Sequence, residues 1–430
     1  MKKWKIIFTA ILLMVVMAAC SSENQSNGNA EGNLEPDVIT AWAWDPLFNI
    51  AALELAEKRY DQVDEDFQLE IIENAQKDIV QKLNTGLSSG TLNGMPNIVL
   101  IEDYRAQSFL QAYPDAFYDI SEYINIDDFA DYKKAPTSFD GKQYGLPFDT
   151  GVTGLYLRTD YLEEAGYTPE DLTNITWDEF IEVGKDIVDK TGKSMISLNP
   201  NDPDHLRHMI QTTGQWFTKE DGETIDIAGN EAVKQALQVY KTMLEEGIAK
   251  TNSDWSSRLA DFNSGKVVSV ATGNWMTPSI KAEESQSGKW TVVPIPRLSV
   301  DGAVNASNLG GSSLYVLNIP GKEKAAEFLA STFGSDNDFY EELVTEVGAI
   351  GTYLPALDGE AFNQTDEFFA NQTVTADLVE WMKEIPNVNY GMHTYAIMDI
   401  FTGELQNYRS GKDIDEVLND AQQQAEAQLN

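Results

Sequence analysis

Short apolar stretches alternate with longer amphipathic ones along most of this chain, and this alternation constrains the fold more than any other feature. Residues 38–44 are rich in β-branched and aromatic side chains, as strands are, and Asp45-Pro46 ends them. Helical spacing follows over 47–60, an alternating stretch over 67–72 and a helical pattern over 79–87. The pattern also predicts strands at 95–101, 144–149, 154–157, 267–271, 290–295 and 313–319, a capping box at Thr176–Glu179 and a mostly helical tail from Ala376. This order indicates an α/β fold with mostly parallel sheets flanked by helices.

The length and composition limit the possible architectures and partners. A chain of 430 residues is too long for one ordinary domain and suits two domains or one large bilobed unit. Its 69 acidic and 30 basic residues give a formal net charge of −39. Nucleic acids and anionic membrane surfaces both require basic patches, so neither is expected as a partner. An acidic surface suits an exported protein that stays monomeric.

The first residues have the form of a secretory signal. Three lysines precede an apolar run over 6–19, which is too short to span a bilayer comfortably. Cys20, the only cysteine, follows two alanines at the position that a lipoprotein signal peptidase requires. We therefore expect a signal peptide over 1–19 and a lipid anchor at Cys20, followed by a flexible polar tether, the two covering 20–36. The alternative is an ordinary signal peptide in which the cysteine is coincidental.

Familiar catalytic and metal-binding motifs do not match this sequence. Residues 191–194 resemble the end of a phosphate loop, but Ile187 replaces its leading glycine. Residues 310–312 begin like a nucleophile elbow and lack its closing glycine. His205 and His208 could share a helix face, although without a nearby cysteine a zinc site is a weak alternative. We expect no catalytic residue, no metal and no cofactor.

Aromatic, acidic and amide side chains follow the predicted strands where they end. In an open α/β sheet, ligands bind beyond the carboxyl ends of the strands, so these residues are expected to converge on one site. A flat aromatic ring covers the apolar face of a sugar, while carboxylates and amides bond its hydroxyls. The candidates are Trp42, Trp44, Asp45, Glu102, Asp103, Phe148, Asp149, Asn274 and Trp275.

Each candidate also has an ordinary structural explanation. A tryptophan in a strand is usually part of the core, and Trp42 and Trp44 lie on one face, so at least one of them is expected to pack internally. Glu102 could cap the next helix, and Asp149 could be a turn residue. The glycines at 310–311 could form only a tight loop.

Three motifs resemble the extracellular solute-binding proteins of carbohydrate ABC importers, the maltose-binding-like group. They are Gly-Lys-Gln-Tyr-Gly-Leu-Pro at 141–147, the segment 154–166, and Thr-Trp-Asp-Glu-Phe at 176–180. The opening segment 41–52 looks most like the branch that binds lactose and L-arabinose oligosaccharides.

The resemblance implies two α/β lobes with a ligand cleft between them, joined by crossovers near Phe148, 294–296 and 332–335. Lobe one would comprise 37–148 plus 297–332, and lobe two 149–296 plus 333–430. The expected ligand-binding residues are Trp42, Asp45, Glu102 and Asp103 from lobe one, Trp216, Asn274, Trp275, Tyr353 and Trp381 from lobe two, Asp149 near the hinge, and Gly310, Gly311 and Ser312 as backbone donors.

The function implied is that of a binding protein which captures a mono- or oligosaccharide by lobe closure and delivers it to an ABC permease. Its expected location is the outer face of the cell membrane of a Gram-positive bacterium, held there by the lipid anchor. Two alternatives stay open. One is an exported glycoside hydrolase whose acid pair would come from Glu102, Asp103 and Asp149. The other is a binding protein for a non-sugar such as a peptide or polyamine.

Overall fold

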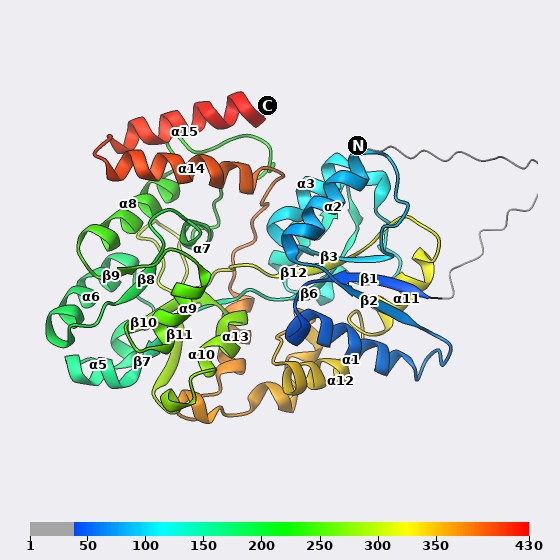
Figure 1. Ribbon diagram of the computed structural model, residues 1–430, viewed down its shortest axis with the longest axis horizontal. Helices are drawn as coiled ribbons and strands as arrows, with labels where there is room; N and C mark the ends of the chain where they lie inside the picture. Colours follow the sequence, from blue (N-terminus) through cyan, green and yellow to red (C-terminus); the bar gives the residue numbers. More distant parts are fainter. Residues whose placement is uncertain (1–37, 430) are drawn as a thin grey trace, which may run out of the picture. The chain divides into compact units, whose positions relative to one another are not determined.

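The computed structural model describes residues 38–429, in which two main sheets are found (Figure 1). One has five strands in the order β2-β1-β3-β12-β6, and the other has three in the order β10-β7-β11. The predicted signal peptide, the anchor at Cys20 and the tether lie outside the described residues. The strands are β1 (Ile39–Ala43), β2 (Leu69–Glu73), β3 (Ile98–Glu102), β4 (Ser138–Phe139), β5 (Lys142–Gln143), β6 (Gly145–Asp149), β7 (Thr153–Arg158), β8 (Ile196–Leu198), β9 (Ala249–Thr251), β10 (Ser269–Gly273), β11 (Trp290–Pro294) and β12 (Ser312–Val316).

Helices occupy most of the sequence between these strands. The α-helices are α1 (Ala51–Tyr60), α2 (Gln76–Ser88), α3 (Asp103–Ala112), α4 (Lys134–Thr137), α5 (Thr159–Ala165), α6 (Trp177–Thr191), α7 (His205–Gln211), α8 (Glu231–Glu245), α9 (Trp255–Asn263), α10 (Thr277–Lys281), α11 (Lys322–Ser331), α12 (Asn337–Glu342), α13 (Val374–Lys383), α14 (Thr394–Arg409) and α15 (Ile414–Leu429). Single turns of other helix types are η1 (Pro46–Ile50), η2 (Pro114–Ala116), η3 (Ile126–Asp128), η4 (Asp131–Lys133), η5 (Pro169–Leu172), η6 (Asn274–Met276), η7 (Glu284–Gln286), η8 (Leu343–Val347), η9 (Leu354–Ala356), η10 (Glu360–Asn363) and η11 (Glu367–Phe369).

Four strands of the five-stranded sheet, β1, β3, β6 and β12, are mostly buried, whereas edge strand β2 is partly exposed. Successive side chains of a strand point to opposite sides, so the buried strands pack on both faces. Ala41 and Ala43 of β1 belong to the same hydrophobic cluster as Leu53 of α1. Trp42, between them, belongs to a second cluster that includes Leu83 of α2. Helices therefore cover both faces of this sheet, as the continuous apolar strands predict.

The α/β class is as predicted, but the strand directions are more mixed than expected. β1 runs parallel to β2 and β3, and β8 runs parallel to β9. β12 is antiparallel to β3 and β6, and both β10 and β11 are antiparallel to β7. The apolar pattern of a strand carries no information on its direction. Direction follows instead from the chain passing between the two sheets and entering each from the other side.

The three-stranded sheet has its own core, built with the longer helices of the chain. Leu155 and Leu157 of β7 cluster with Phe180 of α6 and with apolar side chains of α8, α14 and α15. The predicted capping box is confirmed at the start of α6, where the Thr176 hydroxyl accepts from the Glu179 N–H at 3.2 Å and Glu179 accepts from the Thr176 N–H at 2.8 Å. We call the elements around this sheet (β7–β11, α5–α10, α14 and α15) the second half, and those around the five-stranded sheet (β1–β6, β12, α1–α4, α11 and α12) the first half.

The chain passes between the two halves next to the ends of their strands. It leaves the first half between β6 and β7 and returns between β11 and β12. Past α11, the chain still contacts the first half, because Arg59 of α1 bonds Asp336 and Glu342, each at 2.7 Å. Residues 333–430 are expected in lobe two, so this contact favours a later boundary. The lobe boundaries stay a prediction.

Candidate functional site

Three of the predicted site residues lie side by side at one edge of the five-stranded sheet. Ser312, the first residue of β12, is paired with Glu102 at the end of β3 and with Asp149 at the end of β6. The ends of β3 and β6 and the start of β12 therefore meet at this edge, and whether these residues bind a ligand stays a prediction.

A buried ionic cluster lies next to these strand ends. We call it the Lys133 cluster; its members are Lys133, Asp103, Asp149, Ser312 and Ser313. The Lys133 ammonium donates to Asp103 Oδ2 at 2.5 Å and to the main-chain oxygens of Asp149 and Ser312 at 3.0 and 2.9 Å. Ser313 Oγ donates to Asp103 Oδ1 at 2.8 Å. The N–H of Ser312 donates to Asp149 Oδ1 at 2.8 Å, and the Ser312 hydroxyl donates to the same oxygen.

This cluster links four segments of the first half, and both of its carboxylates accept hydrogen bonds from groups inside the protein. Burial raises the pKa of the Asp103 carboxyl, although Lys133 and Ser313 act in the opposite direction. The same balance raises the pKa of Asp149 to about 6. The side chains of Asp103 and Lys133 are fully buried. Ligand contact through Asp103 or Asp149 stays a prediction, and the bonds in this structure give both residues a structural role.

Glu102 has different surroundings, because its carboxylate meets residues of the second half. We call Glu102, Arg105, Arg207 and Tyr395 the Tyr395 cluster. The Tyr395 hydroxyl of α14 donates to Glu102 Oε2, and Arg105 Nε lies 3.6 Å from the same oxygen. The Arg105 guanidinium lies 3.5 Å from the Tyr395 ring centre, and Arg207 of α7 donates to the Tyr395 hydroxyl at 3.3 Å. A carboxylate, two guanidiniums and a phenol thus meet at the border of the two halves.

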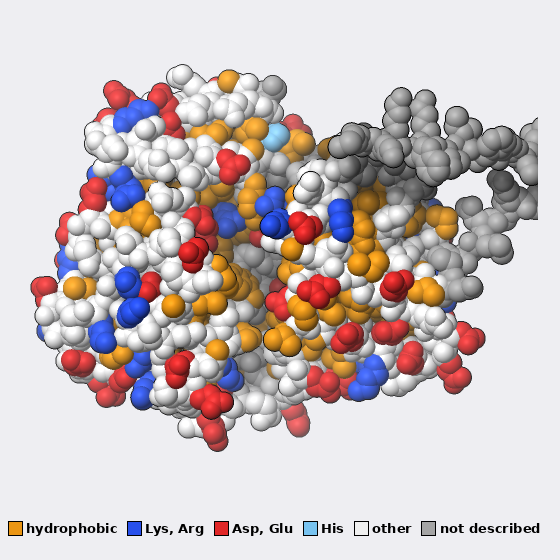
Figure 2. All heavy atoms as spheres, viewed as in Figure 1, with side chains coloured by type: hydrophobic (Ala, Val, Ile, Leu, Met, Phe, Trp, Pro, Cys, Tyr) orange, Lys and Arg blue, Asp and Glu red, His pale blue; other side chains and the backbone are white. Residues whose placement is uncertain are grey.

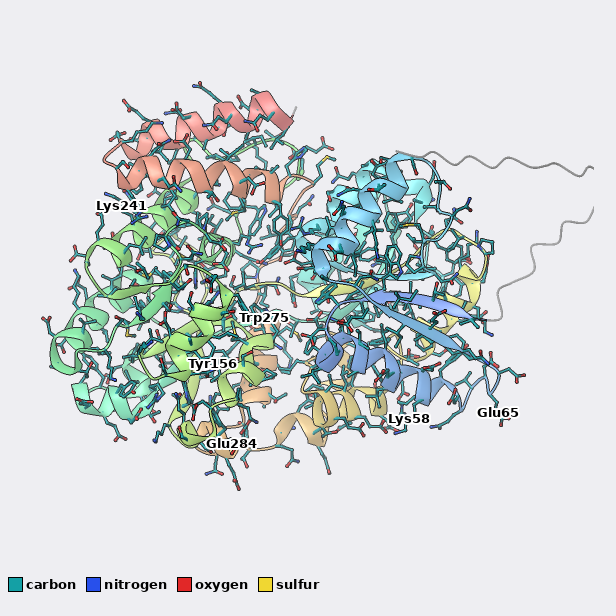
Figure 3. All side chains as sticks on the ribbon, in the orientation of Figure 1. Lys58, Glu65, Tyr156, Lys241, Trp275 and Glu284 are labelled. Atoms are coloured by element: carbon teal, nitrogen blue, oxygen red, sulfur yellow. The ribbon has the colours of Figure 1, made fainter. Side chains whose placement is uncertain are left out.

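Trp275 lies at the end of β10, on the side of the second half that faces the first (Figure 3). Its indole Nε1 donates to the Leu309 carbonyl at 2.7 Å, which fixes the ring against the segment that enters β12. A Cβ at Gly273 or Gly310 would lie 2.4 or 3.1 Å from that nitrogen, so these glycines leave room for the indole. At neighbouring Asn274, Oδ1 is buried and has no hydrogen-bond partner among residues 38–429.

Trp255, which the sequence analysis did not single out, joins Trp275. The two ring centres are 5.9 Å apart, and the planes are inclined by 31°. Trp255 is 49% exposed at the start of α9, and Leu47, in the turn that follows β1, is 86% exposed. Hydrophobic side chains line both sides of the depression between the two halves (Figure 2). Exposed aromatic and apolar groups of this kind are suited to cover the apolar face of a ligand.

Three other predicted residues make internal contacts. Trp42 is 7% exposed and packs with α2, and Asp45 caps η1 by accepting from the Leu47 N–H at 2.9 Å. Tyr353 stacks on Tyr340 at 5.5 Å in the core of the first half. Core packing therefore accounts for Trp42 and Tyr353, and whether they bind a ligand stays a prediction.

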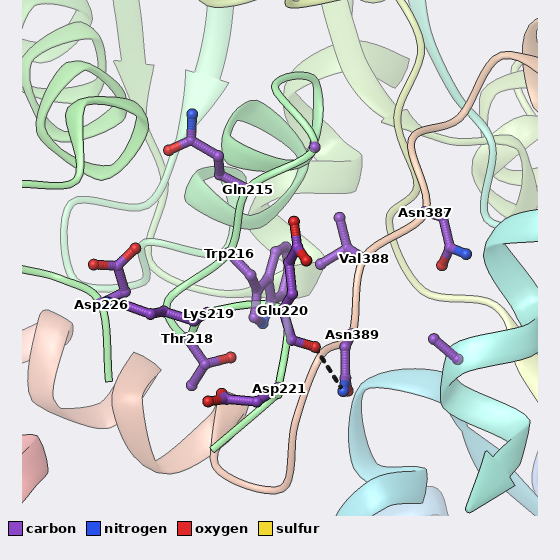
Figure 4. A pocket seen from close by; sticks show the side chains of 12 residues that line it. Gln215, Trp216, Thr218, Lys219, Glu220, Asp221, Asp226, Asn387, Val388 and Asn389 are labelled. Atoms are coloured by element: carbon purple, nitrogen blue, oxygen red, sulfur yellow. Dashed lines mark hydrogen bonds between the residues drawn. The ribbon is translucent and has the colours of Figure 1, made fainter. Parts of the chain in front are cut away.

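Two cavities are lined by predicted residues, and the smaller of them lies at the end of β11. One of about 810 Å³ lies between the loop 214–226 and the segment 387–389, with Trp216 and Thr218 among its lining residues (Figure 4). Trp216 is itself only 2% exposed, donates to Thr394 Oγ1 at 2.9 Å and stacks on Tyr104. The other, about 540 Å³, is lined by Trp381 with Asp377 and Glu384. Neither tryptophan is brought next to Trp275 by the contacts in this structure.

His205 and His208 do share a helix face, but they bond each other. His205 Nδ1 lies 2.9 Å from His208 Nε2. Burial lowers the pKa of His205 to about 4 and that of His208 well below its ordinary value. Within residues 38–429, no three His, Cys, Asp or Glu side chains are grouped to hold a metal ion. No helix in that range has the length and apolarity needed to cross a membrane.

Sequence reasoning missed Arg105, Arg207, Tyr395 and Trp255. Arg105 had a local signal, because it lies three residues after Glu102 in the helix that follows the strand. The other three are on helices remote in sequence from any predicted strand end. Only the packing of α7, α9 and α14 brings them to this border.

Comparison with known proteins extends these observations. A family model described as bacterial extracellular solute-binding protein matches residues 56–374. The lactose-binding protein of Rhizobium radiobacter is 43% identical over 392 residues, covering 91% of this chain and 93% of its own. An arabinooligosaccharide-binding protein of Bacillus subtilis (strain 168) is 27% identical over 352 residues, covering 78% and 77%. Both relatives are binding proteins.

Solved structures share the fold at lower sequence identity. The GacH receptor of Streptomyces glaucescens, solved unliganded and with acarbose, has a TM-score of 0.74 at 17% identity, covering 91% of this chain and 97% of its own. A binding protein associated with an ABC transporter of B. animalis subsp. lactis Bl-04, solved in complex with β-1,6-galactobiose, has a TM-score of 0.71 at 21% identity, covering 90% and 96%. The likeness shows a common fold and confirms the predicted α/β class.

Proposed function

Because this chain belongs to the family of bacterial extracellular solute-binding proteins, we propose that it binds a short saccharide, lactose or a related galactoside, and delivers it to an ABC permease. Membership of the family agrees with the resemblance stated from the motifs. The single observation that carries the proposal is the pair of indoles, the half-exposed Trp255 and the partly buried Trp275, beside Asn274 at the end of β10. The 43% identity to a lactose-binding protein supports the choice of sugar.

The chemistry of these groups suits a neutral saccharide. An indole face covers the C–H face of a pyranose, and a pair of indoles adds buried apolar area. The unpartnered Asn274 Oδ1 can accept from a sugar hydroxyl, which would supply the bond that this buried oxygen lacks. Glu102 supplies a charged acceptor, which makes stronger hydrogen bonds than a neutral one.

Delivery follows from closure of the two halves around the ligand. Glu102 comes from the first half and Trp275 from the second, so a ligand that touches both favours the closed state by its differential affinity. In this proposal the protein is a monomer, anchored through Cys20 to the outer face of the membrane, where the tether keeps it close to its permease. No bond of the sugar is broken.

A ligand panel tests the proposal. The purified protein is mixed with lactose, an arabinotriose, maltotriose, spermidine and a tripeptide, and melting temperature and calorimetric affinity are measured. We expect lactose to raise the melting temperature most, because the proposal makes it the tightest binder of the panel. A ligand at 100 times its Kd stabilises the native state by about 2.7 kcal/mol. A response to spermidine or the tripeptide alone would reject the saccharide assignment.

The hydrolase alternative is tested with the same sugars. The Lys133 cluster occupies Asp103 and Asp149, so an acid pair with Glu102 is not favoured. Chromatography after prolonged incubation should recover intact lactose from both the wild type and the Glu102→Gln variant. Products that appear with the wild type and are absent with Glu102→Gln would make the protein a hydrolase.

A further inference from the structure

The Tyr395 cluster has a property that sugar binding alone does not require: its bonds run directly between the two halves. Glu102 ends β3 of the first half, whereas Tyr395 begins α14 and packs against the hydrophobic core of the second half. The bond from the Tyr395 hydroxyl to Glu102 Oε2 therefore joins the halves directly.

Two arginines hold the Tyr395 ring in place, one from each half. Arg105 of α3 covers the ring at 3.5 Å, and Arg207 of α7 donates to its hydroxyl at 3.3 Å and lies 5.4 Å from the ring centre. Arg207 also lies 4.8 Å from the centre of the Tyr104 ring, so it too contacts both halves. Cation–π contacts of this kind orient an aromatic ring as well as attract it.

The Tyr395 hydroxyl is the donor in this cluster. Burial and the neighbouring Glu102 raise the pKa of the Tyr395 hydroxyl, while Arg207 and Arg105 lower it less. Tyr395 therefore keeps its proton at neutral pH and donates it. A carboxylate has about four acceptor positions on its two oxygens. Tyr395 and Arg105 approach Oε2, and among residues 38–429 no hydrogen bond to Oε1 is found.

We propose that Tyr395 is a positioning residue that links the two halves through Glu102 and orients its carboxylate so that Oε1 stays available to a ligand hydroxyl. Tyr395 touches Glu102 through Oε2 alone, and the ligand is received by the other oxygen. The link between the two halves does not depend on the proposed saccharide function. The orientation of Oε1 rests on that function.

Electron spin distance measurements test the link without ligand. Glu65 and Glu284 are exposed, in the first and second halves, and Figure 3 labels both at the periphery of the molecule. In a full chain carrying Cys20→Ser, Glu65→Cys and Glu284→Cys are spin-labelled and the distance distribution is recorded without sugar. Tyr395→Phe removes only the hydroxyl, and we expect it to add a population at longer distance.

Two further variants complete the test. Glu102→Ala breaks the same bond from the other side and should add the same population, and combining it with Tyr395→Phe should add nothing more. The matched control is Tyr408→Phe, in the same helix, whose ring contacts Lys241 of the second half. It should leave the distribution unchanged. A Tyr395→Phe distribution that matches the wild type overturns the link, and melting temperatures confirm that each variant is folded.

Calorimetry with lactose tests the orientation of Glu102. Loss of a hydrogen bond to a charged group corresponds to an affinity loss of about ten-fold, which we expect for Tyr395→Phe and not for Tyr408→Phe. Unchanged affinity in Tyr395→Phe overturns the orienting role. If the wild type binds no sugar, the proposed function fails, while the distance measurements still decide whether Tyr395 links the halves.

Discussion

The two sheets end in contrasting ways where they face each other. The first sheet ends in charged and hydroxyl side chains, and most of their bonding capacity is used within the protein, as the Lys133 cluster shows. The second ends in Trp275, beside the half-exposed Trp255 and the unpartnered Asn274 Oδ1. One sheet end is held by internal bonds, and the other carries partly exposed aromatic rings. The contrast shows that polar residues at a strand end need not be available for binding.

The largest expected effect comes from breaking the Lys133 cluster. Lys133→Met leaves two buried carboxylates, Asp103 and Asp149, without their cation, and breaking a buried pair in this way costs about 3 to 5 kcal/mol. We expect the free energy of unfolding to fall by that amount in urea titrations. Binding per folded molecule should change less, because Lys133 is fully buried.

The matched control for this prediction is the next residue. Lys134 pairs with Asp127 at 2.8 Å and Asp131 at 2.9 Å, both highly exposed. Lys134→Met should cost less than about 1 kcal/mol, as exposed ion pairs do. Equal losses for the two variants would mean that the Lys133 cluster does not hold the first half together.

The next largest effect should come from the aromatic surface. Trp275→Ala removes an indole that is fixed by its bond to Leu309, and we expect lactose affinity to fall by about 1 to 3 kcal/mol. Calorimetry against the wild type measures the change. Trp255→Ala should weaken binding by a smaller amount, since this ring is half exposed and makes no such bond to any of residues 38–429.

Trp42→Phe is the control that separates stacking from packing. Trp42 is buried among α2 side chains, so this variant should lose stability and keep its affinity for lactose. If Trp42→Phe lowers affinity and Trp275→Ala does not, the aromatic surface lies in the first half and the contrast between the sheet ends is reversed.

Much of the fold follows from the sequence, because local patterns decide it. The apolar runs that become β1, β3 and β12 and the capping box of α6 depend on neighbours within a few residues. Strand direction was not predictable, since β7 and β12 take theirs from the path of the chain between the sheets. The same limit explains Trp255, whose exposure depends on how α9 packs and not on its own sequence.

The site was predictable only in part, for a related physical reason. Sequence identifies the residues at a strand end but not which of them meet a distant partner. Lys133 is 30 residues from Asp103 and 16 from Asp149, in a segment without a distinctive motif. Tyr395 is 293 residues from Glu102. These pairings decide which carboxylates are satisfied internally and which keep a free oxygen.

The smallest expected effect is on the pH dependence of stability. One group in each half contributes to it, and the two contributions have opposite signs. In the first half, the pKa of Asp149 is raised from 3.8 to about 6, so the folded state holds a proton that the unfolded state has lost. This contribution to stability falls as pH rises from about 4 to 6. In the second half, the pKa of His205 is lowered from 6.5 to about 4, so the unfolded state holds the extra proton and stability rises with pH over nearly the same range.

We therefore expect the free energy of unfolding of the wild type to change little between pH 4 and 6.5. It should depend more steeply on pH when either Asp149 or His205 is replaced. Asp149→Asn keeps the acceptor oxygen for Ser312 and leaves Lys133 to Asp103, so stability should then rise with pH by up to about 1 kcal/mol per unit. His205→Phe should shift the slope the other way. Urea titrations at half-unit intervals measure both. Parallel profiles for the wild type and both variants would show that neither group changes its protonation on unfolding, and the opposition between the halves would then have to come from other residues.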